Sequence, residues 1–411
     1  MELEQHCRSC SGSTFELINF GDQPLANDLS LSIEQGVTTF PLAVRVCDHC
    51  ALAQLSYCVD KEILYSDYNY ITPESDELTR HYADIHSFLK GYGYLSTDSH
   101  VLDIGSNIGR LLAFLKPHVR SILGVDPARN VVDMAIDHEI PTFARFFNRT
   151  SAREIEEFSG RKDVIFARHC FAHNEDPGQI LEGVPDILAK DGVLVIENAY
   201  FRDTVEKGEF DQVYHEHMYY YTLRGLSGIL ENYGLKLVDV HHSDVHGGTM
   251  MFVAKYASSK TEPSQRVREY LAAETEMHTP EYYEKFVAQI WRNRTDIRHL
   301  VDELRAEDNT IHAYGASAKA TTLLNYFGLT DLQIPYVVDF TPTKLGKYIP
   351  LANIKVISEE EAAVSDPPDY YLLTIWNYRD EIIRKVRESG NTHTKFILPH
   401  PTVQIVEDPV D

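Results

Sequence analysis

A dense group of histidine, glutamate and tyrosine side chains lies near the middle of the chain. Residues 214–221 read YHEHMYYY and bring Tyr214, His215, Glu216 and His217 together. Such a group suits acid–base chemistry, because a histidine near its ordinary pKa can take up and release a proton at neutral pH. A metal site is a second interpretation, since alternate residues of an extended segment share a face, but the group lacks a clear third ligand. Structural hydrogen bonding is the third.

Four cysteines near the N-terminus form two CxxC pairs, Cys7 with Cys10 and Cys47 with Cys50. Each two-residue spacer lets both sulfurs of a pair face one point, and four thiolates suit tetrahedral zinc. All four positions are filled by protein ligands, so we expect a structural metal. Strand-like pieces between the pairs, such as PLAVRV, predict a β-rich zinc-binding lobe over residues 1–58. Unmetallated cysteines or a redox pair are the alternatives.

A strand, a glycine-containing loop and a helix are predicted over residues 99–115, SHVLDIGSNIGRLLAFL. Asp103 ends the strand, Gly105 and Gly109 lie in the loop, and Asn107 replaces the middle glycine of a dinucleotide fingerprint. The loop resembles the first motif of the class I methyltransferases. Pyrophosphate needs bare amides at a helix N-terminus, whereas S-adenosylmethionine carries an amino-acid tail and a sulfonium. Asp103 could receive the ammonium of that tail, directly or through water.

A second apolar strand, SILGV, ends at Asp126, about twenty residues after Gly105. An acidic side chain at this place can bind both hydroxyls of a ribose. A glycine turn in an unrelated α/β protein would explain the loop alone, but it would not explain the acid and the later strands. The loop and Asp126 together therefore predict a binding site for S-adenosylmethionine.

Further strands over residues 163–169 and 192–198 alternate with helical stretches and predict a parallel sheet covered by helices on both faces. This α/β domain should span about residues 79–257. Ligands of such sheets bind beyond the carboxyl ends of the strands. His169 and His173, which follow one strand, and the histidine-rich segment after the next should therefore lie near the cofactor.

Length and composition predict a folded protein of two or three domains. A chain of 411 residues exceeds the roughly 250–300 residues that one hydrophobic core supports. The net charge of -24 and the absence of a basic stripe argue against nucleic-acid binding. No signal peptide and no stretch of about 18 apolar residues are found, so we expect a cytoplasmic protein without a membrane span. The two remaining cysteines, Cys58 and Cys170, are expected to be buried as small apolar residues.

The C-terminal half is predicted to begin with a helical connector, residues 258–307, followed by a second α/β domain, residues 308–411. Apolar side chains spaced by three and four between residues 281 and 304 predict one long helix that packs between the two α/β domains. The strand TIHAYG, the loop GASAK and the strand IPYVVD then repeat the first domain's arrangement and end at Asp339. Only Gly315 is present in this loop, although small residues at a helix N-terminus suit phosphate groups. A domain that only supports the fold is the alternative.

Several of these segments together resemble a known enzyme family. The CxxC pairs, FGDQPLAND, DIGSNIG, FDQVYHEH and YGASAKATTLLNYFGL are similar to those of the S-adenosylmethionine-dependent 3-C-methyltransferases that act on nucleotide-diphosphate-linked 4-keto-6-deoxyhexoses. The resemblance covers nearly the whole chain. In that family the ketone acidifies the hydrogen on C3, a histidine removes it, and the resulting enolate carbon accepts the methyl group. The resemblance also implies that the linker, residues 59–78, contributes to the active site.

Carried over by motif, the resemblance implies a role for each residue of the histidine-rich segment. His217 would be the general base, and Tyr214 and Glu216 would position the base and the sugar. His173 would help to hold the enolate oxygen, with His169 as its competitor for this role.

The resemblance implies further contacts outside this segment. A linker tyrosine would act in the site, and Tyr68 is preferred over Tyr70, which is two positions away in YSDYNYIT. In the C-terminal domain, Gly315, Lys319 and Asn377 would contact the nucleotide sugar.

Three other functions fit parts of this pattern. A sugar O-methyltransferase would need a base but would give the ketone-directed residues no task. A non-catalytic nucleotide-sugar-binding protein would not need to retain Gly105, Asp126 and the histidines. A nicotinamide-dependent oxidoreductase would need a more typical dinucleotide loop than GASAK.

Overall fold

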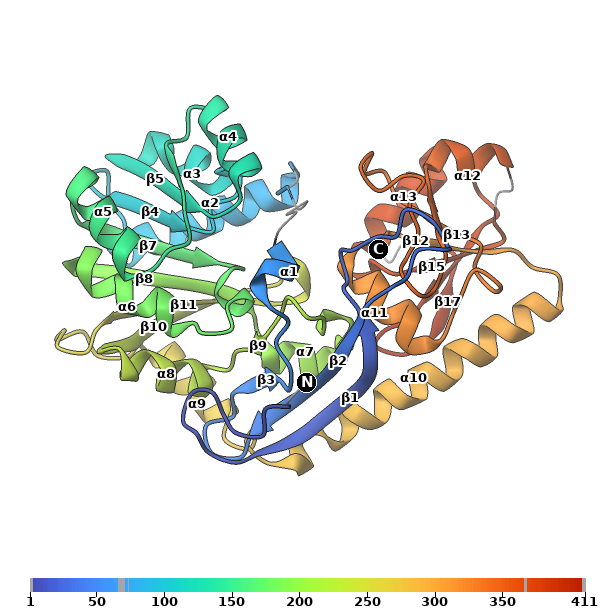
Figure 1. Cartoon of the computed structure of the whole chain (residues 1–411), viewed down its shortest axis with the longest axis horizontal. Coiled ribbons are helices and arrows are strands. Elements are labelled where there is room, and N and C mark those ends of the chain that lie inside the picture. Colours follow the sequence, from blue (N-terminus) through green and yellow to red (C-terminus); the bar gives the residue numbers. More distant parts are fainter. Residues whose placement is uncertain (1–2, 66–70, 73, 366–367, 409–411) are drawn as a thin grey trace.

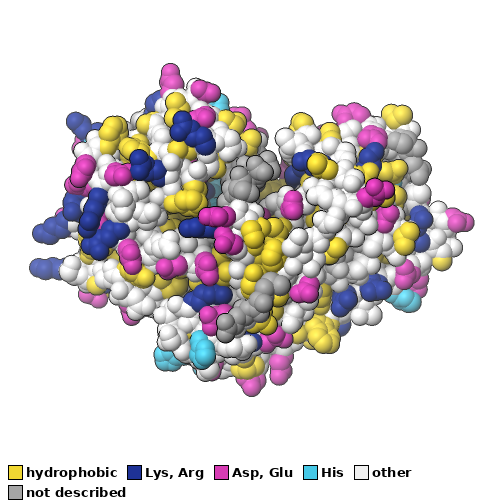
Figure 2. All heavy atoms as spheres, viewed as in Figure 1, with side chains coloured by type: hydrophobic (Ala, Val, Ile, Leu, Met, Phe, Trp, Pro, Cys, Tyr) yellow, Lys and Arg dark blue, Asp and Glu magenta, His cyan; other side chains and the backbone are white. Residues whose placement is uncertain are grey.

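The computed structural model describes residues 3–65, 71–72, 74–365 and 368–408, whose strands form three sheets. Figure 1 shows two α/β domains side by side, with the long N-terminal strands running below them. In the space-filling view a notch separates the two α/β domains at the upper edge of the molecule (Figure 2). No helix among the described residues is long and apolar enough to cross a membrane.

The N-terminal sheet is antiparallel and has the order β1-β2-β3-β9. Three of its strands belong to the predicted zinc-binding lobe: β1 (Thr14–Pro24), β2 (Thr39–Cys47) and β3 (Ala53–Leu55). The fourth, β9 (Tyr219–Tyr220), comes from the histidine-rich segment and pairs with β3 through Ala53↔Tyr220 and Gln54↔Tyr219. The sheet of the N-terminal lobe is therefore completed by residues that lie two and three positions after His217.

The central sheet has the order β10-β11-β8-β7-β4-β5-β6, in which β11 alone runs antiparallel to its neighbours. This order, with the Asp103 loop at its centre, confirms the predicted class I methyltransferase fold. The strands are β4 (His100–Ile104), β5 (Ser121–Asp126), β6 (Thr142–Ala144), β7 (Lys162–Arg168), β8 (Leu188–Ala199), β10 (Leu235–Ser243) and β11 (Thr249–Tyr256).

Helices cover both faces of the central sheet, because successive side chains of its strands point to opposite faces and both faces are apolar. On β4, for example, Val101 packs in one core cluster and Leu102 in the other. The helices of this region are α2 (Asp76–Gly91), α3 (Arg110–Leu115), α4 (Arg129–Asp137), α5 (Arg149–Ser159), α6 (Gly178–Ile187), α7 (Phe201–Lys207), α8 (Leu223–Asn232) and α9 (Gln265–Ala273).

The C-terminal sheet has the order β14-β13-β12-β15-β16-β17 and is parallel except for β17. The predicted second Rossmann-like domain is thereby confirmed. Its elements are β12 (Ile311–Tyr314), α11 (Ala318–Phe327), β13 (Tyr336–Val338), β14 (Lys355–Ile357), α12 (Glu359–Ser365), β15 (Tyr370–Leu373), α13 (Arg379–Glu388), β16 (Lys395–Leu398) and β17 (Gln404–Val406).

The predicted long helix is α10 (Pro280–Ala306). Its buried side chains include Tyr283, Ile290 and Ile297, and they contact α7 of the central domain and α11 of the C-terminal domain. The helix also packs against β1, where Phe15 meets Tyr283 at 6.0 Å between ring centroids. α10 therefore contacts the N-terminal sheet as well as the two α/β domains between which it was predicted to pack (Figure 1).

Candidate active site

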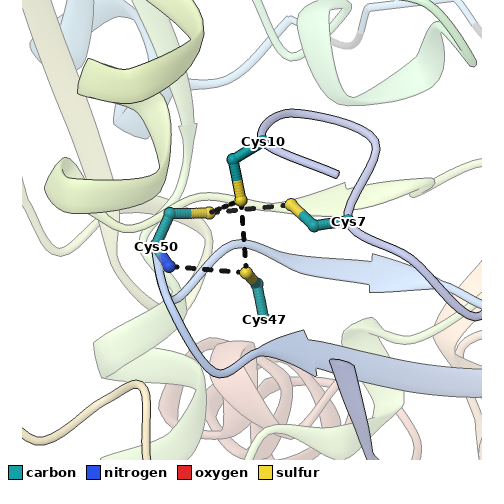
Figure 3. Close-up of side chains that lie close together, drawn as sticks. All are labelled: Cys7, Cys10, Cys47 and Cys50. Atoms are coloured by element: carbon teal, nitrogen blue, oxygen red, sulfur yellow. Dashed lines mark hydrogen bonds between the residues drawn. The ribbon is translucent and has the colours of Figure 1, made fainter. Parts of the chain in front are cut away.

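The four predicted zinc ligands lie together at the end of the N-terminal sheet (Figure 3). The sulfur–sulfur distances are 3.5 Å for Cys10 and Cys47, 3.6 Å for Cys7 and Cys50, and 3.7 Å for Cys10 and Cys50. A regular tetrahedron with Zn–S bonds of about 2.3 Å has edges of about 3.8 Å, so the four thiolates fit zinc. These distances are far longer than a disulfide bond.

Backbone amides support the same four-sulfur site. The N–H of Ser9 approaches the sulfur of Cys7, and the N–H groups of His49 and Cys50 approach the sulfur of Cys47, each at 3.4 Å. Such amides stabilise thiolate charge in a zinc site. Among the described residues these four cysteines are the only group of three or more His, Cys, Asp or Glu side chains with metal-binding spacing.

The loop after β4 requires its two glycines. Gly105 has φ +69° and Gly109 has φ +76°, a region that side chains other than glycine rarely adopt. A Cβ atom on Gly105 would lie 2.7 Å from the Cβ of Cys170, and one on Gly109 would lie 2.7 Å from a methyl group of Ile140. Cys170 and Cys58, which were expected to be buried, are partly buried and pack against the core of the central domain.

Asp126 is held by the loop that it faces. Its carboxylate accepts the backbone N–H of Asn107 and that of Ala128, each at 2.9 Å. The side-chain oxygen of Asn107 accepts the N–H of Thr72 at 3.0 Å. Asn107 therefore ties the linker to the loop, and its amide N–H fixes the carboxylate that is predicted to bind the ribose.

Asp103 is a buried carboxylate whose hydrogen bonding is incomplete among the described residues. Its side chain is 4% exposed, and its Oδ1 atom has no hydrogen-bond partner among the described residues. Burial raises the pKa of Asp103 to about 7, and the negative charges of Asp126 and Glu197 add to this shift against the opposing charge of Arg168. A cationic group bound beside the loop would satisfy this carboxylate, as the ammonium of S-adenosylmethionine would.

The histidine-rich segment is folded as a turn rather than as the extended segment assumed for a shared metal-binding face. The 3₁₀-helix η3 (Phe210–Gln212) and a turn at residues 214–216 precede β9. His215 is buried and its Nε2 lies 3.2 Å from the carbonyl oxygen of Phe40, in the N-terminal lobe. His215 and His217 therefore face different surroundings, which removes the basis for a metal site shared by them.

His217 has both ring nitrogens engaged. Its Nδ1 lies 2.9 Å from the carbonyl oxygen of Gln212, and its Nε2 lies 2.7 Å from the hydroxyl of Tyr214. Because a carbonyl only accepts, Nδ1 carries the proton of the neutral ring and Nε2 presents its lone pair to the Tyr214 hydroxyl. Burial and the nearby His173 hold the pKa of His217 well below its usual range, so the ring is neutral and able to accept a proton.

His173, in η2 (Phe171–His173), is the histidine that lies against His217. Their ring centroids are 5.1 Å apart, and burial lowers the pKa of His173 to about 4. The N–H of Met218 donates to the carbonyl of Ala172 at 2.9 Å and ties the two segments together. His169 instead has its Nε2 3.9 Å from Glu197. The geometry therefore favours His173 over His169 as the partner of His217.

Glu216 is held from the N-terminal lobe. Its Oε1 atom accepts a hydrogen bond of 2.5 Å from the side-chain amide of Asn27, and burial raises the pKa of Glu216. Asn27 was not among the predicted site residues, although it belongs to the FGDQPLAND motif that carried the family resemblance. Tyr68 and Tyr70 lie outside the described residues.

The predicted residues of the C-terminal domain surround the loop after β12. Gly315 has φ +101°, and a Cβ atom there would lie 2.6 Å from the side chain of Ile375. The Nζ atom of Lys319 is buried, has no hydrogen-bond partner among the described residues and lies 5.8 Å from the ring centroid of Trp376. Asn377 is next to Trp376 in η5 (Trp376–Tyr378).

The segment before His217 connects this domain to the central one. Trp376 donates its indole N–H to Asp211 at 2.8 Å, and Thr322 donates its hydroxyl to the carbonyl of Val213 at 3.0 Å. The charge of Lys319 is close enough to lower the pKa of His217. It also acts on Glu209, where it opposes burial, which raises the pKa of this carboxyl to about 7. Lys319 thus faces the same junction as the histidine-rich segment.

Comparisons with known proteins match the three parts of the chain. The family described as "Putative zinc binding domain" matches residues 7–65, "Methyltransferase domain" matches residues 76–240, and "C-methyltransferase C-terminal domain" matches residues 244–401. The C-methyltransferase NovU of Streptomyces niveus is 34% identical over 405 residues, which cover 97% of this chain and 96% of the relative.

Solved structures, among them that of a methyltransferase, are similar to part of the chain. Magnesium protoporphyrin IX methyltransferase (ChlM) from Synechocystis PCC 6803 with bound SAM is 12% identical, with a TM-score of 0.36, and the match covers 48% of this chain and 97% of that one. The PH0226 protein from Pyrococcus horikoshii OT3 is 14% identical, with a TM-score of 0.37, and the match covers 48% and 100%.

Proposed function

This chain belongs to the C-methyltransferase family and is an S-adenosylmethionine-dependent, zinc-binding enzyme, and we propose that it methylates C3 of a nucleotide-diphosphate-linked 4-keto-6-deoxyhexose. The observation that carries this proposal is the hydrogen bonding and the neutral charge of the His217 ring. Its Nδ1 proton is held by the Gln212 carbonyl and its Nε2 lone pair is turned toward the Tyr214 hydroxyl. A neutral, oriented imidazole of this kind is what proton abstraction beside a ketone requires.

Nε2 of His217 takes the proton from C3, and the electron pair of the C–H bond moves toward the ketone oxygen to form the enolate. The cofactor supplies an electrophilic methyl group bound to a sulfonium. Held by Asp103 and Asp126, S-adenosylmethionine would give this methyl group to C3 and leave as the thioether, and the ketone would re-form. The proton taken from C3 is left on His217 and returns to solvent, which restores the neutral base.

Neighbouring side chains divide the remaining tasks. His173, whose ring lies 5.1 Å from that of His217, would stabilise the enolate oxygen, and Tyr214 would hold Nε2 until the sugar displaces its hydroxyl. Glu216 would bind a hydroxyl of the sugar. Asp103 and Asp126 would bind the ammonium and the ribose of S-adenosylmethionine.

The C-terminal domain would bind the nucleotide diphosphate. The buried ammonium of Lys319 supports this assignment, because an unpaired buried cation favours an anionic ligand. Gly315 and Asn377 lie on either side of Ile375 and Trp376 and would form part of the same surface. We also propose the domain boundaries predicted from the sequence, with β9 of the central region added to the sheet of the zinc-binding lobe.

The test is incubation with S-adenosylmethionine in deuterated buffer, with a panel of nucleotide-linked 4-keto-6-deoxysugars. The expected result is the mass gain of one methylene unit, with hydrogen exchange at C3 and a carbon-bound methyl group in the NMR spectrum of the product. A methoxy signal would replace the proposal with O-methylation. Neither methylation nor exchange across the panel would reject the keto-sugar substrate and leave the assigned family and cofactor in place.

A further inference from the structure

We propose that Asn27 is a positioning residue of the active site, through which the zinc-binding lobe sets the orientation of the Glu216 carboxylate. The inference rests on the proposed function, in which Glu216 binds the sugar. The side-chain amide of Asn27 donates to Oε1 of Glu216 at 2.5 Å across 189 positions of sequence. This bond uses one carboxylate oxygen and leaves the other, Oε2, to accept a hydroxyl of the substrate.

The loop that carries Asn27 is fixed by the C-terminal domain. The carbonyl of the preceding residue, Ala26, accepts the Thr321 hydroxyl at 2.9 Å. Three positions further on, Ser30 and Tyr348 exchange two backbone hydrogen bonds, each of 2.9 Å. Anchors on both sides of Asn27 hold its backbone in place, so little backbone entropy is lost when its side chain orients a partner.

Residues on either side of Glu216, His215 through its side chain and Met218 through its backbone, are held by the zinc-binding lobe. His215 lies 3.2 Å from the Phe40 carbonyl oxygen, and Met218 accepts the N–H of Leu55 at 3.0 Å. The main freedom left to Glu216 is therefore rotation of its own side chain. The bond from Asn27 removes that freedom, and it does so without adding a second charge to the site.

The hydrogen bond from Asn27 stabilises the ionised form of Glu216. Burial raises the pKa of its carboxyl, and the hydrogen bond from Asn27 is the contribution that opposes burial. A primary amide that donates to a carboxylate favours its ionised form. Asn27 therefore supports both the direction and the charge of the group that would accept the sugar hydroxyl.

A double-mutant cycle tests the inference, with Asn27→Ala, Glu216→Ala, the double variant, and Asp28→Ala as the matched control. Asp28 is the neighbour of Asn27 and, like it, is exposed. Asn27→Ala should lower kcat/KM for the nucleotide sugar by about tenfold, the scale of one hydrogen bond to a charged group. The KM for S-adenosylmethionine and the Tm should stay unchanged. The double variant should be no worse than Glu216→Ala alone, because the lost bond is shared.

Several results would overturn the inference. Additive losses in the cycle would mean that Asn27 acts on the substrate or the fold independently of Glu216, and equal losses for Asp28→Ala would point to the loop as a whole. Binding of the nucleotide sugar, measured by calorimetry on the same four proteins, applies the same criterion if turnover of Glu216→Ala is too low to measure. Failure of the proposed function is a separate outcome, since the wild-type enzyme would then methylate no sugar of the panel.

Discussion

The two α/β domains use the same backbone arrangement at the end of their first strand but differ in how their acidic groups are compensated. In the central domain the N–H of Gly105 donates to Val125 and the carboxylate of Asp126 accepts two backbone amides. In the C-terminal domain the N–H of Gly315 donates to Val338, and Asp339 accepts the amides of Ala316 and Thr341, each at 2.8 Å.

The difference lies in charge. Lys344 places its Nζ 3.5 Å from the Asp339 carboxylate and donates to the Ala316 carbonyl at 2.9 Å. Among the described residues no Lys or Arg forms an ion pair with Asp126. Two positions before the glycine, the central domain has Asp103, with a buried oxygen that lacks a partner, and the C-terminal domain has Ala313.

From this contrast we propose that the uncompensated acid, more than the shape of the loop, distinguishes the loop that binds the cationic cofactor. Burying a carboxylate without a partner costs free energy, and a cationic ligand recovers that cost when it binds. The C-terminal loop satisfies its own acid and has no such requirement. The same backbone arrangement can therefore accompany a cationic ligand in one domain without requiring one in the other.

The substitution with the largest expected effect should change the chemical step in the central domain without changing cofactor binding. His217→Asn should lower kcat by about a hundredfold or more, because the proposed general base is lost. The affinity for S-adenosylmethionine should be unchanged, since the acids near the loop remain. Steady-state kinetics and calorimetry measure the two quantities, and a variant with normal turnover would show that His217 is not the base.

A matched pair of substitutions tests the comparison directly. Asp126→Ala should weaken S-adenosylmethionine binding by about thirtyfold or more, or about 2 kcal/mol, the scale of one hydrogen bond to a charged group. Asp339→Ala should leave this affinity unchanged and should lower the free energy of unfolding by about 1–3 kcal/mol, because two amides lose their acceptor. Calorimetry and chemical denaturation report the two effects. If both variants bound the cofactor equally weakly, the distinction between the loops would be wrong.

The features that could be predicted are those that a short stretch of sequence, or a repeated spacing within it, determines. The strand, loop, helix, strand and acid of each α/β domain are contiguous, so residues 99–126 and 311–339 revealed both folds. The spacing of the cysteines also indicated the zinc site. In each case the residues that define the feature lie close together in sequence or repeat a period that one element imposes.

The unpredicted part depends on contacts between distant segments. The pairing of β9 with β3 involves two residues on one side, too few to show an alternating pattern, and its partner Ala53 is far from Tyr220 in sequence. The turn that separates His215 from His217 exists because the N-terminal lobe binds one side chain and η2 lies beside the other. Asn27 reaches Glu216 from a loop whose backbone is bound by the C-terminal domain.

The pH dependence of the affinity for S-adenosylmethionine tests the proposal that Asp103 binds the ammonium group of this cofactor. Because burial raises the pKa of Asp103 to about 7, much of the free enzyme carries a proton there at pH 6. A bound ammonium favours the ionised carboxylate, so binding releases this proton and the affinity rises as the pH rises through 7. The Kd should fall by about tenfold between pH 6 and pH 8.

Calorimetry in buffers of different ionisation enthalpy measures the released proton. Asp103→Asn should bind more weakly at pH 8 and should lose the pH dependence between pH 6 and pH 8. A pH dependence that persists in this variant would assign the proton to another group and remove Asp103 from the contrast between the two loops.

The smallest expected effect concerns Lys344, the residue that compensates the second loop. Lys344→Met should lower the free energy of unfolding by about 0.5–1 kcal/mol, because the side chain is 29% exposed and solvent screens its pair with Asp339. Lys347→Met is the control, since this nearby lysine forms no ion pair among the described residues. In an Asp339→Ala background the Lys344 substitution should cost nothing further. A full additional loss there, measured by denaturation, would show that Lys344 stabilises the loop through its bond to Ala316 rather than by balancing the acid.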